Sequence, residues 1–172
     1  MSTPSAEALI PLGTWTVDPD DSELTFAARG MFGLAKVTGS FVRFEGELSV
    51  TADATTGELR IVAESLDTRN ARRDTHLRSA DFFDVENHPV VTFVLAGITA
   101  DDAPEPSMNG ELRIRNSRLP VRAPLTVDPL TGDRLRLATE LSVDRAAAGV
   151  GWSRLGMIRG DARLQATVTL MR

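Results

Sequence analysis

The sequence contains no cysteine and only two histidines, His76 and His88, among its 172 residues. Without cysteine the chain cannot form disulfides, thiolate nucleophiles, iron–sulfur clusters or Cys-ligated zinc sites. Two histidines twelve positions apart do not by themselves form a His-rich metal site, and no loop carries the spaced acidic ligands of an EF-hand. We therefore expect neither a metal ion nor another cofactor.

Long hydrophobic runs and concentrated positive charge are also missing. No apolar stretch approaches the roughly 18 residues that a transmembrane helix needs, and the first residues lack the basic and apolar regions of a secretory signal. We expect a cytoplasmic protein without stable membrane insertion. The formal net charge of -5, without any basic stripe, disfavours binding to nucleic acid and electrostatic adhesion to anionic membranes.

The pattern that is present is an alternation of apolar and polar residues with a period of two, typical of strands with one dry face. It is clearest where Leu135, Leu137 and Leu141 alternate with charged residues. Phe41 breaks the parity of its neighbours, which indicates a bulge or bend near residues 40–42. Eight or nine strands are predicted, at about residues 14–18, 23–29, 42–50, 58–64, 90–98, 111–115, 121–127, 134–144 and 163–170.

Short connections, with a turn at residues 19–21, join most of these segments, and no alternation of strands with helices occurs. An all-β antiparallel domain over residues 13–172 follows, preceded by a mobile tail over residues 1–12 that contains two prolines. Such strands can close into an up-and-down barrel or pack as a sandwich. The pattern by itself leaves both architectures open, and it leaves open whether the interior is hollow or filled.

One long connection, residues 68–89, differs from the rest of the chain. Asn70 is a good N-cap, and residues 71–79 contain neither proline nor glycine. We predict one short helical insertion at about residues 70–79. Long connections are usually binding loops or lids, and the apolar Leu77, Phe82 and Phe83 make disorder costly. The insertion is thus either a lid over a binding site or a helix that merely seals the core.

The same region carries the run SLDTRNARRDTHLRSADFFD, which resembles the signature S-[IV]-D-T-x-N-x-x-R-D-x-H-L-x-S-x-D-F-F-D of the YceI-like family. The resemblance implies a lipocalin-like antiparallel up-and-down barrel of about eight strands that holds a long isoprenoid lipid, such as a quinone or a prenyl phosphate. The chain departs from the family pattern D-x-x-H-S, where Asp21 stands at the histidine. The matching residues are Ser65, Asp67, Thr68, Asn70, Arg73, Asp74, His76, Leu77, Ser79, Asp81, Phe82, Phe83 and Asp84.

An apolar lumen would favour a long aliphatic ligand, because each buried CH2 group contributes about 0.8 kcal/mol. Candidates for contacts with a polar head group are Asp74, His76 and Arg78, although Asp74 and Arg78 share a helix face and would alternatively pair with each other. We expect the cavity or its mouth to be lined by Phe26, Phe44, Phe82, Phe83, Phe93, Leu137, Leu141, Trp152 and Leu164.

The function that these expectations favour is binding, sequestration or transport of an isoprenoid-type lipid without catalysis. The sequence leaves two alternative functions open. One is an enzyme that acts on a hydrophobic substrate with His76 as acid/base; the other is a filled barrel that serves as a stress-related protein-interaction module. A homodimer is compatible with each of them.

Overall fold

The computed structural model describes residues 9–30, 35–100, 104–131, 133–144 and 161–172. It consists of antiparallel strands with one α-helix, and a single 3-10 turn follows β4 at Ala63–Ser65. The elements are β1 (Gly13–Gly30), β2 (Ala35–Phe41), β3 (Phe44–Val50), β4 (Thr55–Val62), β5 (Leu66–Asp67), α1 (Ala71–Arg78), β6 (Val90–Thr99), β7 (Ser107–Ile114), β8 (Ser117–Pro129), β9 (Arg134–Asp144) and β10 (Asp161–Met171).

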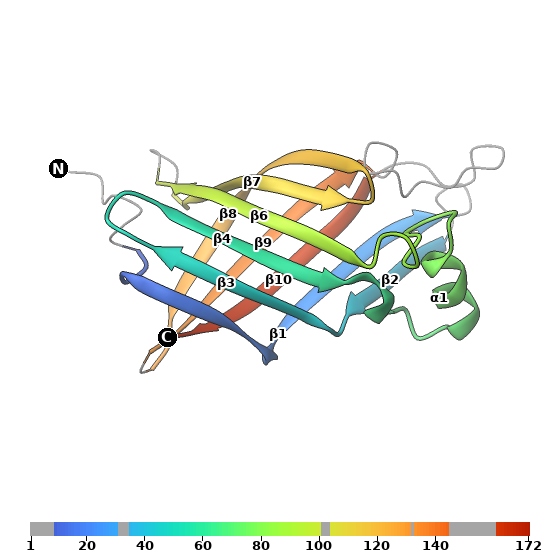
Figure 1. The fold of residues 1–172 in the computed structure, drawn as a ribbon, viewed down its shortest axis with the longest axis horizontal. Helices are drawn as coiled ribbons and strands as arrows, with labels where there is room; N and C mark the ends of the chain where they lie inside the picture. Colours follow the sequence, from blue (N-terminus) through green and yellow to red (C-terminus); the bar gives the residue numbers. More distant parts are fainter. Residues whose placement is uncertain (1–8, 31–34, 101–103, 132, 145–160) are drawn as a thin grey trace.

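The sheet closes on itself. Its order is β10-β9-β8-β7-β6-β4-β3-β1, and β10 also pairs with β1, so that eight strands of the described chain form a closed antiparallel barrel (Figure 1). The closing register places Leu164 opposite Phe26 and Leu170 opposite Val17. Closure leaves none of these eight strands with an unpaired edge, and it confirms the predicted barrel rather than a sandwich.

One feature of the strands differs from the prediction, and another agrees with it. Residues 19–21 do not form a turn between two strands; β1 continues through them, with a register shift against β10 between Asp18 and Glu23. A bulge accommodates Pro19 there, because the bulged residues need not donate to the ladder. Near residue 41 the predicted irregularity is a bend: β2 ends at Phe41, β3 begins at Phe44, and Val42 between them is 60% exposed.

The end of the barrel that holds the C-terminus is filled. Ile10 and Trp15 are 1% and 2% exposed, and Trp15 Nε1 donates a hydrogen bond of 3.0 Å to the carbonyl oxygen of Pro11. The guanidinium of Arg172 lies 4.9 Å from the centre of the Trp15 ring. Ile10, inside the predicted tail, is therefore packed against this end of the barrel, whereas Leu12 is 56% exposed. Residues 1–8 lie outside the described part, and the mobile tail over residues 1–12 stays a prediction.

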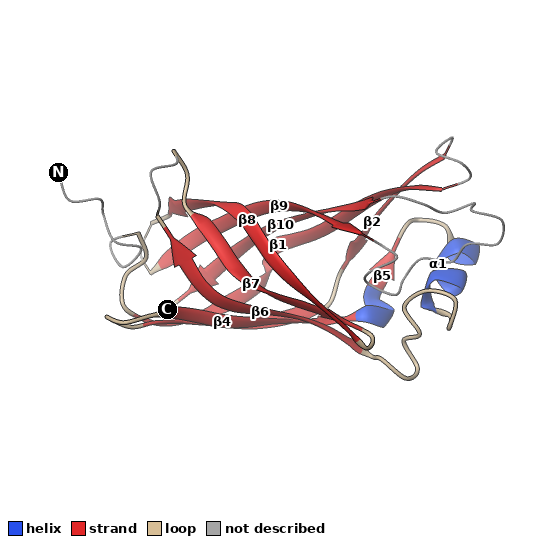
Figure 2. Cartoon of the chain, turned by 90° about the horizontal axis from the view of Figure 1, so that it is seen from above, coloured by secondary structure: helices blue, strands red, loops and turns tan. Residues whose placement is uncertain are grey.

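The helical insertion lies at the opposite end (Figure 2). α1 begins after Asn70, whose side chain accepts a hydrogen bond of 3.0 Å from the backbone N–H of Arg73, as the N-cap prediction requires. The short strand β5 leads into it and pairs with β2 through Phe41 and Leu66. β2 in turn pairs with the second half of β1, so these strands extend the barrel wall beside α1.

Candidate ligand-binding site

A cavity of about 510 Å³ lies inside the barrel and reaches the insertion. Each of the eight strands of the closed barrel contributes apolar side chains to the lining, and β8 does so through Leu125. α1 and the segment after it contribute the part of the lining nearest the helix. Trp15 and Ile10 are absent from the lining, which places the hollow part away from the filled end. The barrel is thus plugged at one end and hollow towards α1.

Small side chains in the lining leave part of this space open, while two inward-facing glycines outside the lining make room for neighbouring side chains. At Gly110 an added Cβ would lie 2.8 Å from Phe93 Cζ, and at Gly46 it would lie 2.8 Å from Cγ2 of Val17. Larger side chains therefore reach across the positions where these strands carry only hydrogen. Ala28 and Ala166, unlike these glycines, line the cavity and leave room above them.

Most of the apolar residues predicted from the sequence do line this cavity. Phe44 does not: it is 8% exposed and packs in the core outside the lining. Trp152 lies outside the described residues. Phe82 and Phe83 are part of the wall and do not plug the space. The predicted residues found in the lining are Phe26, Phe82, Phe83, Phe93, Leu137, Leu141 and Leu164.

Aromatic rings join the barrel wall to the insertion. The ring centres of Phe26 and Phe41 are 5.4 Å apart, and those of Phe41 and Phe83 are 5.8 Å apart in an edge-to-face arrangement. Such pairs add to the stabilisation that area burial gives. Phe41, whose parity indicated a bulge or bend, therefore forms the contact between β1 and the insertion.

Two of the predicted head-group residues have structural partners instead. Asp74 is 7% exposed, and its Oδ1 accepts hydrogen bonds from both the backbone N–H and the hydroxyl of Thr68. Arg78 donates bonds of 2.9 Å to the carbonyl oxygens of Glu64 and Leu66. Neither residue lines the cavity, and the alternative Asp74–Arg78 ion pair is not formed, because each side chain holds α1 to the chain segment before it.

His76 does line the cavity at the helix end. Its Nε2 lies 3.1 Å from Oδ2 of Asp81, and its ring centre lies 5.0 Å from that of Phe82 in an edge-to-face contact. The side chain remains 45% exposed. His76 is thus placed at the boundary between the apolar cavity and solvent.

A polar lining residue that the sequence reasoning missed is Arg73. It is half-buried, its Nε donates 2.9 Å to Oγ1 of Thr68, and its Nη2 donates 2.9 Å to the Thr68 carbonyl oxygen. The available signal was the i, i+4 spacing of Arg73 and Leu77, which puts both on one helix face; Leu77 also lines the cavity. The helix face of α1 that lines the cavity therefore carries Arg73, whereas Asp74 and Arg78 lie outside the lining.

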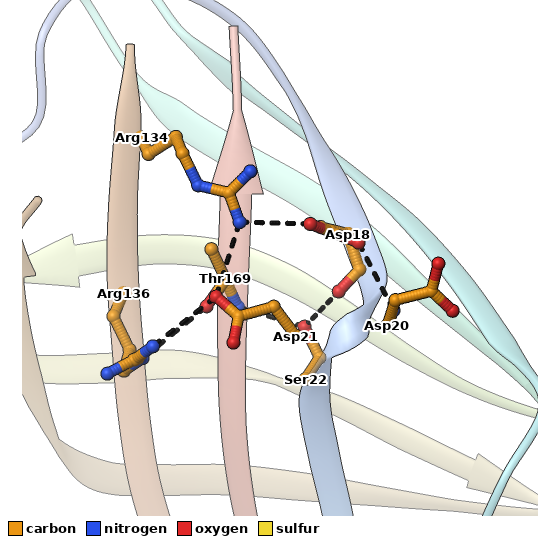
Figure 3. Close-up of polar contacts among 7 residues, drawn as sticks. All are labelled: Asp18, Asp20, Asp21, Ser22, Arg134, Arg136 and Thr169. Carbon is orange, nitrogen blue, oxygen red and sulfur yellow. Dashed lines mark hydrogen bonds and ion pairs between the residues drawn. The ribbon is translucent and has the colours of Figure 1, made fainter. Parts of the chain in front are cut away.

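The aspartate at the position of the family's histidine belongs to a different site. Arg134 Nη2 lies 2.9 Å from Asp18 and 3.2 Å from Asp21, and Arg136 Nη2 lies 3.3 Å from Asp21 (Figure 3). The hydroxyl of Thr169, followed by the two guanidinium groups, holds the pKa of Asp21 below its usual value. None of these residues lines the cavity. The cluster ties the bulge of β1 to the barrel wall.

Other kinds of site find no support in the described part of the chain. Its histidine, aspartate and glutamate side chains form no group of three or more that could hold a metal ion. No helix among these residues is long and apolar enough to cross a membrane.

Relatives of known sequence match part of this chain. A UPF0312 protein of Azotobacter vinelandii is 32% identical over 92 residues, which make up 52% of this chain and 48% of that protein. A UPF0312 protein of Staphylococcus aureus is 35% identical over 109 residues, 59% of this chain and 57% of the relative. The chain spans about half the length of the curated relatives it matches.

Solved structures share this fold over most of the chain. BcnA of Burkholderia cenocepacia superimposes with a TM-score of 0.78 at 21% identity, over 89% of this chain and 98% of that one. A polyisoprenoid binding domain of Saccharophagus degradans gives 0.74 at 16% identity, over 91% and 97%. The family model of the YceI-like domain matches residues 15–170. With the closed barrel and its signature insertion, the chain belongs to the YceI-like family.

Proposed function

We propose that this protein binds a long-chain isoprenoid-type lipid, a quinone or a prenyl phosphate, in the barrel lumen and carries or sequesters it. The observation that supports this most directly is the apolar cavity of about 510 Å³ between the filled end and α1. Its size lies within the roughly 300–1,000 Å³ that ligand sites span. A hollow interior favours a ligand over a filled barrel that acts only through its surface.

The chemistry of the lining selects for an aliphatic chain. Polar ligand groups would lose their hydration without gaining partners beside leucine, valine and phenylalanine side chains, which costs several kcal/mol for each group. An aliphatic chain instead gains about 0.8 kcal/mol for each buried CH2 group. A flexible, branched hydrocarbon with one polar end therefore fits a cavity that is apolar within and carries Arg73 and His76 near α1.

The structural neighbours agree with a binding role. The Saccharophagus degradans domain, named a polyisoprenoid binding domain, shares the fold over 91% of this chain. Family membership and this neighbour favour a binding protein over an enzyme. We accordingly propose a role for His76 at the cavity mouth rather than in acid/base catalysis.

Extraction of the freshly purified protein with organic solvent, followed by mass spectrometry, tests this function. We expect a prenyl lipid in near-stoichiometric amount. Leu137→Glu, which places a carboxylate in the lining, should abolish lipid retention, whereas Ser142→Glu, at an exposed position of the same strand, should retain it. An empty extract, with no prenyl lipid taken up on later incubation, would refute the proposal.

A further inference from the structure

Arg73 stands out among the polar groups that line the cavity. Two acidic residues, Glu47 and Glu58, also line the cavity, but both are exposed and lie opposite each other on neighbouring strands. Glu47 pairs in register with Thr16, next to the filled end and away from α1. Near α1 the lining contains Arg73 and His76 and no carboxylate of the described residues. The insertion therefore presents a fixed positive charge to an otherwise apolar space.

The guanidinium of Arg73 is held in position by the protein. Nε and Nη2 each donate 2.9 Å to Thr68, to its hydroxyl and to its carbonyl oxygen. Thr68 is 5% exposed and is itself fixed by Asp74, whose Oδ1 accepts from the Thr68 amide and hydroxyl. The order Arg73–Thr68–Asp74 sets the orientation of the guanidinium before any ligand arrives.

This arrangement leaves donors available. Arginine carries five N–H donors in a planar fork, and Nη1 of Arg73 makes no hydrogen bond within the described residues. The nearby carboxylate of Asp74 is directed to Thr68 and forms no ion pair with Arg73 among the described contacts. A guanidinium beside apolar surface is most favourable when an anion supplies the missing partner, and its fork matches phosphate oxygens.

We propose that Arg73 binds the anionic head group of the ligand, so that the lipid in this barrel is a prenyl phosphate and not a quinone. This inference rests on the proposed function, because it concerns the polar end of the same lipid. The chain occupies the lumen, the phosphate lies at the insertion, and His76 stands beside it at the mouth. A neutral quinone offers carbonyl acceptors but no charge, and it would leave the guanidinium without a counterion.

The test compares ligands that share a chain and differ in charge. Delipidated protein is titrated with geranylgeranyl monophosphate, with geranylgeraniol and with a menaquinone of the same prenyl chain, and binding is followed by calorimetry. A charge-assisted hydrogen bond predicts that the phosphate binds about 10- to 100-fold more tightly than the alcohol, equivalent to about 1.4–2.8 kcal/mol. Equal or tighter binding of the alcohol or of the quinone would overturn the assignment.

Variants separate recognition from folding. Arg73→Gln should lower the affinity for the phosphate by the same factor and leave the alcohol unchanged, while Arg72→Gln, at the exposed neighbouring position outside the lining, should alter neither. Arg73→Lys keeps the charge and should retain part of the preference. A loss of both ligands in Arg73→Gln, with an unchanged thermal transition, would refute a role in head-group selection.

Competition with inorganic phosphate, and the comparison of the three prenyl probes, distinguish this inference from a free-anion site and from failure of the proposed function. Excess inorganic phosphate should displace neither lipid, because the chain supplies most of the binding free energy; displacement would assign the site to free anions and overturn the lipid head group. If none of the three prenyl probes binds the delipidated wild-type protein, the proposed function itself fails. If the alcohol binds as well as the phosphate, only the role of Arg73 fails.

Discussion

Filling the cavity by mutation gives the sharpest test of a hollow barrel. Ala166 lies on β10, faces inward opposite Leu24 and Thr139, and lines the cavity. Ala166→Phe would project a ring into the empty space. In a hollow barrel the ring gains apolar burial of about 1.5–3 kcal/mol, so the lipid-free variant should be as stable as the wild type or more stable.

The same ring competes with the ligand. Displacing one five-carbon isoprene unit from the lumen removes about 4 kcal/mol of burial, at about 0.8 kcal/mol for each carbon. For a lipid that occupies the whole cavity this corresponds to an affinity about a thousandfold weaker. The stability of the lipid-free protein and its lipid affinity should therefore change in opposite directions.

The measurements are urea unfolding of delipidated protein and titration with geranylgeraniol. Ala138→Phe is the matched control, because Ala138 is the neighbouring position on β9 opposite Thr167, faces the outside and does not line the cavity; its lipid affinity should be unchanged. If the interior is filled, Ala166→Phe would instead cost about 1–3 kcal/mol through overpacking. That loss, with unchanged lipid binding, would refute the hollow barrel.

Three other changes test how the insertion and the wall are held. Arg115→Ala removes the bonds of Nη1 to the carbonyl oxygens of Ala80 and Phe82 and should speed amide exchange around Phe82, with a stability loss of about 1–3 kcal/mol; unchanged exchange would contradict this anchoring. Asp74→Ala leaves the Thr68 amide and hydroxyl without their acceptor and should lower the unfolding free energy by about 1–3 kcal/mol in urea denaturation. An unchanged unfolding free energy would contradict a structural role for these hydrogen bonds. Because the pKa of Asp21 in the folded protein lies below its usual 3.8, its stabilisation is present above that pH and is lost as the pH falls further. Asp21→Asn should therefore flatten the acid limb of the stability profile, and an unchanged limb would contradict the cluster.

The sequence alone determined the local structure and much of the fold. Alternation with a period of two follows directly from strand geometry, so the strands β4, β9 and β10 lie close to their predicted positions. Asn70 marked the start of α1 because a capping side chain acts on the amide three residues later. The signature around Phe82 indicated the family, and most of the predicted apolar residues line the cavity.

The tertiary structure decided what depends on contacts between distant segments. Whether the lumen is hollow follows from volumes: small lining residues such as Ala28 and Ala166 leave space that no parity rule measures. β1 continues through Pro19 because β10 pairs with it on both sides of the bulge, a constraint that lies more than a hundred residues away. Arg73 faces the cavity because Thr68 and Asp74 fix α1 on the chain before it, and helix spacing alone does not set that rotation.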